Sequence, residues 1–127
     1  MELPQVSNQN VESLLSREEI VRQTAEQIMK DFGMFGVEIS FSGNTENAYH
    51  ELHMQLTDQI TDLFDRNYDL LLSVLYQVDI SDKDIRKTRL ELPDYTDIEV
   101  VAHQVIVRDL KKVLLRRYFK LKGSNTL

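Results

Sequence analysis

The sequence predicts an all-α protein, a single-domain bundle of four to five helices with a short extended segment around residues 37–41. Three observations lead to this fold class. Apolar residues recur at helical spacing in each long segment. Helix start and stop signals divide the chain into these segments and leave only short connections. The last segment, Thr96 to Lys122, begins with residues that are apolar on every side of the axis, which is typical of a buried helix.

The composition is that of one globular domain. The chain has 127 residues, is 42% hydrophobic and contains no cysteine, so it can bury a core but has no disulfide and no thiolate. No apolar run approaches the ~18 residues that span a bilayer, and the first residues do not resemble a secretory signal. We expect a cytoplasmic protein with a flexible N-terminal arm at 1–15, a helical bundle domain at 16–122 and a C-terminal tail at 123–127.

The first helix is expected to begin in a capping box and to end at a glycine. In the capping box, Ser16 accepts a hydrogen bond from the backbone of Glu19, and Glu19 reaches back. Gly33 suits the left-handed conformation that ends many helices. Between them, one buried stripe is spaced by four, three and four residues: Val21, Ala25, Ile28 and Phe32.

Residues 33–44 do not follow the helical pattern. Val37, Ile39 and Phe41 alternate with polar residues, which is typical of a strand. No second strand is visible to pair with it, and a lone strand is not stable. Either the segment lies across the bundle as an apolar plug, or its edge pairs with another copy of the protein. We favour the plug, because short apolar loops often cap small bundles.

The middle of the chain predicts two helices with a turn between them. Thr45 is expected to cap a helix that runs to about Asp65. Its buried stripe consists of Tyr49, Leu52, Leu56, Ile60 and Leu63. The pattern shifts phase at 66–69, which indicates a bend, and a strongly apolar helix follows at 70–78.

Two more helices complete the bundle. Ser81 with Asp84 is a start signal for a short helix that ends at about Leu90, before a Leu-Pro-Asp-Tyr sequence. Thr96 with Glu99 forms a second capping box, which begins the last helix.

Three short motifs suggest a relationship to other proteins. They lie at 75–80 (Leu-Tyr-Gln-Val-Asp-Ile), 108–112 (Arg-Asp-Leu-Lys-Lys) and 117–118 (Arg-Tyr). With them the chain resembles, over residues 17–120, a small family of uncharacterised bacterial all-helical proteins. The resemblance implies a helical fold and a bacterial origin, and it implies no activity, cofactor or substrate.

The histidines are the candidate metal ligands. His50 and His53 lie three residues apart with Glu46 one turn before them, and His103 lies one turn after Glu99. Bundle interiors can hold metal ions with such ligands, but the Glu-x-x-His pairs of a paired-iron site are missing. His103 also lies on an apolar stripe, where a hydrogen-bonded core histidine is the usual explanation. We therefore expect no metal and no cofactor.

The sequence shows no catalytic motif. It has no Gly-x-Ser-x-Gly turn, no glycine-rich phosphate loop and no dinucleotide fingerprint. Carboxylates are abundant, but nothing in the pattern places one of them in a desolvating pocket. We expect no catalytic residue and no enzymatic activity.

Charge is distributed unevenly along the chain. Residues 99–127 carry a net charge of +5, and the remainder carries −11. Two rows at helical spacing stand out, an acidic one and a basic one: Asp58, Asp62, Asp65 and Asp69, then Arg108, Lys112, Arg116 and Lys120. Each row lies about opposite an apolar stripe, so both are expected to face outward. They are then either solvated faces or surfaces that meet between molecules.

Two apolar residues beside the basic row favour a contact between molecules. Leu115 and Phe119 flank the cations, as in an interface core with a polar rim. The predicted interaction surface is Arg108, Lys112, Leu115, Arg116, Phe119 and Lys120. In the alternative, the N-terminal arm covers the two apolar residues with Leu3, Val6 or Val11.

The leading functional hypothesis is a small non-enzymatic protein–protein interaction module that forms a homo-oligomer or binds a protein partner. A first alternative is a nucleic-acid or ribosome-associated factor that uses the basic C-terminal helix, although the pI near 5.0 speaks against it. A second is a metal-binding helical bundle. No membrane partner is expected.

Overall fold

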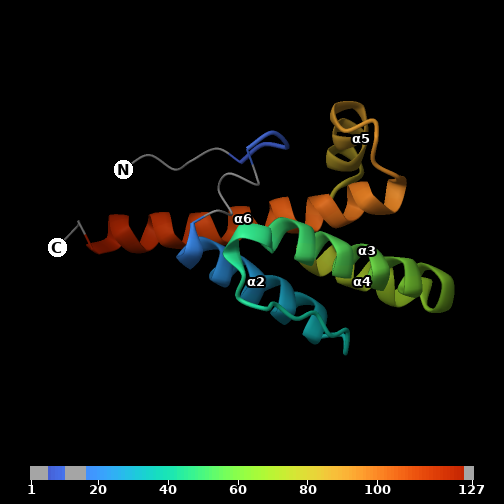
Figure 1. The fold of residues 1–127 in the computed structure, drawn as a ribbon, viewed down its shortest axis with the longest axis horizontal. Helices are drawn as coiled ribbons and strands as arrows, with labels where there is room; N and C mark the ends of the chain where they lie inside the picture. The colour runs from blue at the N-terminus through green and yellow to red at the C-terminus, as the bar shows by residue number, and fades with distance from the viewer. Residues whose placement is uncertain (1–5, 11–16, 125–127) are drawn as a thin grey trace.

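Helices make up most of the described chain. The computed structural model describes residues 6–10 and 17–124 (Figure 1). The elements are α2 (Glu18–Gly33), the 3₁₀ turn η1 (Thr45–Asn47), α3 (Ala48–Arg66), α4 (Tyr68–Val78), α5 (Asp82–Glu91) and α6 (Asp97–Ser124). These residues contain five α-helices and no strand, so the prediction of an all-α bundle of four to five helices is confirmed.

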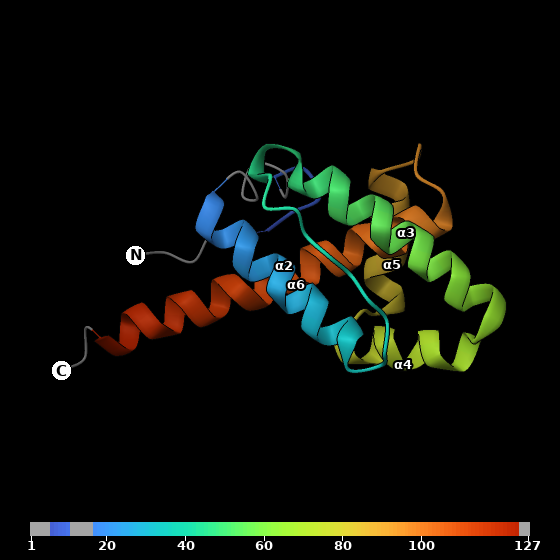
Figure 2. The ribbon, with the colours of Figure 1, turned by 60° about the horizontal axis from the view of Figure 1, so that its bottom comes forward.

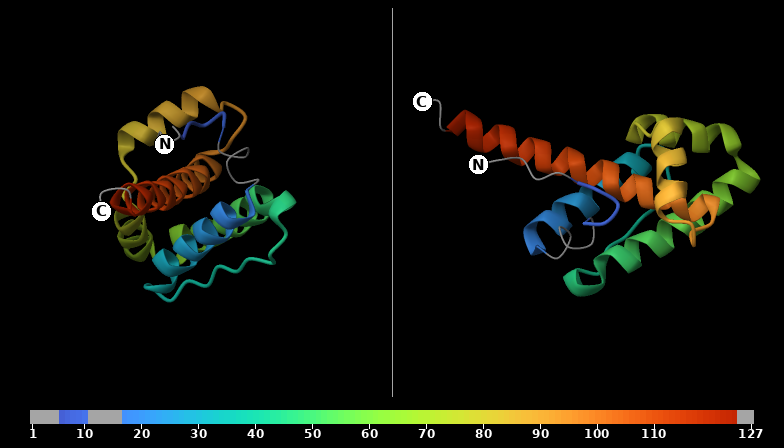
Figure 3. Two further views of the ribbon diagram at one scale, coloured as in Figure 1. Left: turned by 90° about the vertical axis from the view of Figure 1, so that its left-hand side faces the viewer. Right: turned by 90° about the horizontal axis from the view of Figure 1, so that it is seen from above.

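α6 is the central helix of the bundle. It packs against α2, α3, α4 and α5, and a view close to its axis shows it between α5 on one side and the other helices on the other (Figure 3). Val105, Ile106 and Leu110 are completely buried. The prediction that its first half is buried on every side is therefore confirmed. The largest buried side chains packed around it are Ile28, Phe32, Leu52, Leu56, Ile60 and Val74.

The end of α2 differs from the prediction. Gly33 is the last helical residue, and the chain takes one more right-handed step at Met34. The left-handed residue is Gly36, at φ 75°, and Val37 then donates its backbone N–H to the carbonyl of Phe32. The prediction that Gly33 is the left-handed residue that ends the helix is therefore wrong. The reversal needs three residues after the helix, and only the last of them has a positive φ. Ser16, the predicted cap, lies outside the described residues.

The segment after α2 crosses the bundle in an extended form. Val37 and Ile39 are buried in the core, and Phe41 is half-buried against it. The intervening Ser40 exchanges backbone hydrogen bonds with the Gln55 amide, which accepts at 3.0 Å and donates at 2.7 Å. The segment pairs with α3 side chains and forms no strand in the described chain. This arrangement is the predicted plug, and it occupies part of the backbone edge that a second copy would need.

The α3–α4 region follows the prediction except at its start. Asn44, and not Thr45, is the cap: its side chain accepts from the backbone of Glu46, because the chain first makes the η1 turn. The predicted bend is confirmed at Asn67. Its side chain accepts from the backbone of Leu70 and begins α4.

The caps of α5 and α6 are confirmed. Ser81 Oγ accepts from the backbone of Asp84 at 3.2 Å. Thr96 Oγ1 accepts from the backbone of Glu99 at 3.2 Å, and the Glu99 carboxylate accepts from the backbone of Thr96 at 2.9 Å. This reciprocal pair is a complete capping box.

The two chain ends lie mostly outside the described residues. Of the predicted arm, residues 6–10 lie against α5 and α6, where Val6 packs on the core and the Asn8 side chain bonds Thr88 on α5. α6 continues to Ser124, two residues beyond the predicted end of the bundle. In the described part of the chain, no helix is long and apolar enough to span a membrane.

The central position of α6 predicts which leucines the fold depends on. Leu110 is fully buried, so Leu110→Ala is expected to lower the free energy of unfolding by roughly 2–5 kcal/mol. Leu90 on α5 is 84% exposed and provides the matched control, for which we expect a change within about 0.5 kcal/mol. Urea denaturation followed by circular dichroism measures both. Equal effects of the two substitutions would contradict the central role of α6.

Candidate functional site

Three residues of the predicted basic row contact α2 or the end of α4; Arg108 and Lys112 are half-buried, and Arg116 and Lys120 are exposed. Arg108 forms an ion pair of 2.8 Å with Asp79, at the end of α4. Lys112 lies 3.2 Å from Asp31 of α2, and Arg116 donates to the side-chain oxygen of Gln27 at 2.6 Å. The prediction that the row faces outward is therefore wrong for Arg108 and Lys112, and it holds for the exposed Arg116 and Lys120. A central helix has neighbours on several sides, so the direction opposite one apolar stripe is not solvent.

The next arginine continues this contact. Arg117 donates to Gln23 at 3.1 Å and forms an ion pair of 3.3 Å with Glu19, in the first turn of α2. The Arg117 hydrogen bond lowers the pKa of Glu19. A shallow cavity of about 290 Å³ remains between the two helices, lined by Lys30, Arg116, Arg117 and Lys120 together with polar and acidic side chains of α2. Carboxylates of the same chain therefore pair with Arg108, Lys112 and Arg117, whereas Arg116 meets only the neutral side chain of Gln27.

The acidic row runs along α3 and into α4. Asp58, Asp65 and Asp69 are exposed, and Asp62 forms an ion pair of 2.8 Å with Arg66, one turn further along the same helix. No ion pair of the described residues joins this row to the basic one. The acidic face is therefore open to solvent, as predicted.

The two apolar residues of the predicted surface are exposed. Leu115 is 39% exposed and Phe119 is 62% exposed. Val6, one of the three arm residues that could cover them, lies elsewhere, near Val107 and the α5 helix. The other two, Leu3 and Val11, lie outside the described residues.

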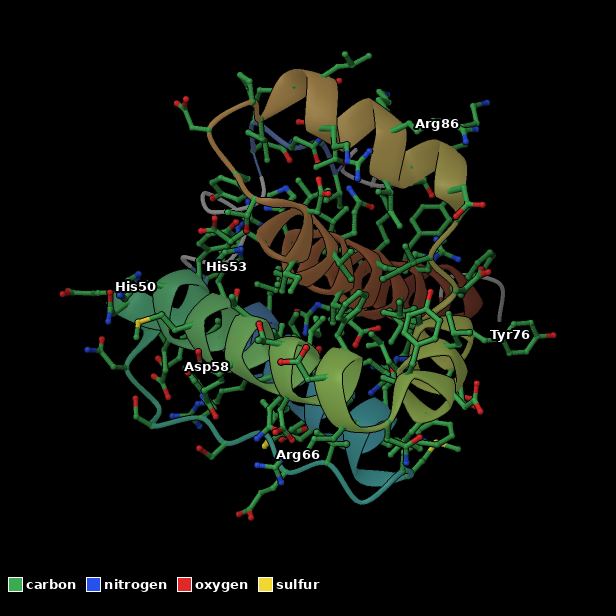
Figure 4. All side chains as sticks on the ribbon, turned by 90° about the vertical axis from the view of Figure 1, so that its right-hand side faces the viewer. His50, His53, Asp58, Arg66, Tyr76 and Arg86 are labelled. Carbon is green, nitrogen blue, oxygen red and sulfur yellow. The ribbon has the colours of Figure 1, made fainter. Side chains whose placement is uncertain are left out.

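A second exposed apolar surface was missed by the sequence analysis. It is formed by Phe64, Tyr68, Leu72 and Tyr76, which we call the α4 row; each of them is about half exposed or more. The rings of Phe64 and Tyr68 meet edge to face at 5.5 Å, and Tyr76 points away from the body of the molecule (Figure 4). A constant step of four in the sequence was the signal. The sequence analysis described residues 70–78 only as a strongly apolar helix and did not distinguish its faces.

α4 cannot bury all of its apolar residues. Leu71, Val74 and Val78 face the core and are buried. Tyr68, Leu72 and Tyr76 of the α4 row lie on other sides of α4, Phe64 lies at the end of α3, and each of these side chains remains about half exposed or more. An apolar stripe of this kind on a small domain commonly marks an interaction surface.

Two buried carboxyl groups meet beside the basic row. Asp31 and Asp109 are both almost fully buried, and the Lys112 ammonium lies 3.2 and 3.3 Å from them. Among the described residues, no other donor reaches an oxygen of Asp109. Burial, together with the hydrogen bond and the charge of Asp31, raises the pKa of Asp109 to about 8. The protonated form of Asp109 is therefore favoured near neutral pH, and it leaves one carboxylate, that of Asp31, facing the Lys112 ammonium.

The second buried polar cluster is centred on His103. Its Nδ1 lies 2.5 Å from the Tyr49 hydroxyl, and its Nε2 lies 3.0 Å from the Asn8 side-chain oxygen. Because an amide oxygen only accepts, Nε2 carries the proton and Nδ1 accepts from Tyr49. The Tyr49 hydroxyl in turn accepts from Tyr95 at 3.0 Å. His103 is thus the hydrogen-bonded core histidine that the sequence predicted.

The environment of His103 keeps the imidazole neutral. Burial, together with the charge of the neighbouring His53, lowers the pKa of His103 to about 4. His53 stacks on Tyr49 with ring centres 5.4 Å apart and donates to the backbone carbonyl of Glu99 at 3.0 Å. With both ring nitrogens engaged and the charged form disfavoured, His103 is poorly placed to take a proton from a substrate.

An open cavity of about 590 Å³ lies on the outer side of this cluster. Its walls include Tyr49, His53, Tyr95 and Glu99, and His50 and Glu46 stand at its rim. His50 is exposed in the first turn of α3, and the His53 side chain reaches from α3 to α6 (Figure 4). The structure does not bring the three histidines together as a ligand set. In the described residues, no three histidine or carboxylate side chains are grouped as a metal site.

The shifted pKa values of Asp109 and His103 predict that the free energy of unfolding decreases from pH 6.5 to pH 8. An unfolded aspartate has a pKa of about 4, so folding takes up a proton at Asp109 between about pH 4 and 8, and stability decreases as pH rises through this range. His103 acts oppositely: its stabilisation is complete above pH ~6.5 and is lost as pH falls toward 4. Between pH 6.5 and 8 only Asp109 contributes, and we expect a loss of roughly 1–2 kcal/mol.

Asp109→Asn tests this assignment. The amide is neutral at every pH and can still donate to Asp31, so the loss of stability from pH 6.5 to 8 is expected to disappear. Urea denaturation at a series of pH values measures it. Asp58→Asn, at an exposed position, should keep the wild-type slope, and an unchanged slope in Asp109→Asn would contradict the raised pKa.

Tyr49→Phe tests the buried chain of hydrogen bonds. Removing the hydroxyl leaves His103 Nδ1 without its donor, and the cost expected for an unsatisfied buried acceptor is about 1–3 kcal/mol. Tyr76 is 89% exposed and provides the control. Tyr76→Phe should change the free energy of unfolding by less than about 0.5 kcal/mol. Equal effects would show that the Tyr49–His103 bond contributes nothing to stability.

Comparison with known proteins adds no assignment to these surfaces. No family model, no curated protein and no solved structure matches the chain. The resemblance to bacterial helical proteins stays a prediction, and the functional argument depends on the geometry described above.

Proposed function

We propose that the protein is a small non-enzymatic protein–protein interaction module that self-associates. One observation carries the proposal: the α4 row places four large apolar side chains on the surface of a chain of only 127 residues. Burying such side chains is the main favourable contribution to most protein–protein contacts. Tyrosine and phenylalanine are also enriched at the centres of interfaces.

The charges around the α4 row support a specific contact. Asp65 and Asp69 are exposed beside it, and Asp62 with Arg66 lies one turn earlier. An apolar centre with a charged rim is the usual anatomy of an interface. The charges select the partner and its orientation more than they add affinity.

The polar clusters support the non-enzymatic part of the proposal. His103 and the Asp31–Asp109 pair are buried and bonded within the domain, where they stabilise packing between helices. A cytoplasmic location in a bacterium belongs to the same proposal.

The nucleic-acid alternative has less support. Arg108, Lys112 and Arg117 each form an ion pair with a carboxylate of the same chain. Phosphate binding would have to compete with these contacts. The metal-binding alternative would need ligands beyond the histidines, which the structure holds apart.

Leu72→Asp tests the proposal. A carboxylate in the middle of the α4 row must be desolvated on association, so the dissociation constant of the homo-oligomer is expected to rise at least about tenfold. Sedimentation velocity at high micromolar concentration in low salt measures it, and Leu90→Asp on the exposed side of α5 is the matched control. A wild-type protein that stays monomeric under these conditions would contradict self-association.

A further inference from the structure

The end of α6 projects from the bundle. The Arg117–Glu19 ion pair is made in the first turn of α2, and α6 continues for seven residues beyond Arg117, to Ser124. At 1.5 Å per residue this is about 10 Å of helix. Figures 1 and 2 show this part of α6 extending past the start of α2. The backbone of α6 therefore extends beyond the helices that pack around it.

The chemistry of this end is apolar and basic. The surface that we consider begins before Arg117 and continues onto the projecting part of the helix; we call Lys111, Leu115, Phe119 and Lys120 the α6 end. Leu115 and Phe119 are exposed, one turn apart on the same side of the helix. Lys111 and Lys120 bring positive charge beside them. The carboxylates of other elements that pair with cations of this helix are Asp31 and Glu19 on α2 and Asp79 at the end of α4.

The charges beside the α4 row are negative, opposite to those of the α6 end. Its four apolar residues stand beside the exposed carboxylates of Asp65 and Asp69. The two surfaces are therefore matched in both respects, because each combines exposed apolar side chains with charges that attract the other. Such matching sets the partner and orientation of an interface.

The two surfaces cannot meet within one molecule. The α3–α4 corner and the end of α6 lie at opposite ends of the bundle (Figures 1 and 2). We propose that the α6 end of one copy docks on the α4 row of a second copy, so that copies join head to tail. This inference rests on the proposed self-association.

Symmetric alternatives bring like charges together. A two-fold dimer through the α4 row would place Asp65 and Asp69 of both copies at one interface, and a dimer through the α6 end would do the same with lysines. Like charges across an interface are unfavourable. The head-to-tail contact avoids this repulsion. A head-to-tail dimer still has one unpaired α4 row and one unpaired α6 end. The assembly therefore either grows as the protein concentration rises or closes into a ring.

A mixing experiment distinguishes these arrangements. Leu72→Asp disables the α4 row and leaves the α6 end intact, and Phe119→Asp does the reverse. Each variant alone is expected to be a monomer by sedimentation velocity, with its dissociation constant raised at least about tenfold. An equimolar mixture is expected to form a one-to-one dimer and nothing larger, whereas the wild type forms larger species.

The double variant Leu72→Asp/Phe119→Asp is the control, and it should form no dimer when mixed with itself. Far-UV circular dichroism and thermal melting of each variant establish that it folds. If Phe119→Asp still dimerises alone, or if the mixture of single variants stays monomeric while the wild type associates, the head-to-tail contact is wrong and self-association stands. If the wild type is monomeric, self-association itself fails.

Discussion

The structure depends on burying the first half of α6 from all sides. Val100, Val105, Ile106 and Leu110 have no exposed surface, and they lie on different sides of the helix. A helix of this kind cannot lie on a surface, so the other helices must surround it. The packing of α2, α3, α4 and α5 around α6 follows from this constraint.

The same constraint brings polar groups into the core. A helix with neighbours on every side also carries its polar residues inward, and His103 and Asp109 are buried with the rest. Each is accommodated by a neutral charge state. His103 loses its proton and accepts from Tyr49, and Asp109 keeps its proton beside Asp31 and Lys112. These groups join helices that are distant in sequence, and their burial links the stability of the fold to pH.

A bundle arranged around one long helix leaves apolar surface at its two ends. α4 buries one side on the core and exposes Tyr68, Leu72 and Tyr76 on another. At the opposite end, α6 is longer than the helices that cover it. Both exposed surfaces therefore arise from the shape of the bundle, and the self-association that we propose would bury them.

The sequence by itself determined the all-α class, the central α6 and the caps at Ser81 and Thr96, because these depend on periodicity and on hydrogen bonds within four residues. The predicted helix stop at Gly33 and cap at Thr45 were wrong, because at each place the chain makes a turn of several residues and a neighbouring residue, Gly36 or Asn44, takes the expected role. Which way a charged row faces was decided only by tertiary structure: Lys112 meets Asp31 because α2 packs there. The exposure of the α4 row was decided in the same way, since the spacing shows that residues share a face but not which element covers it.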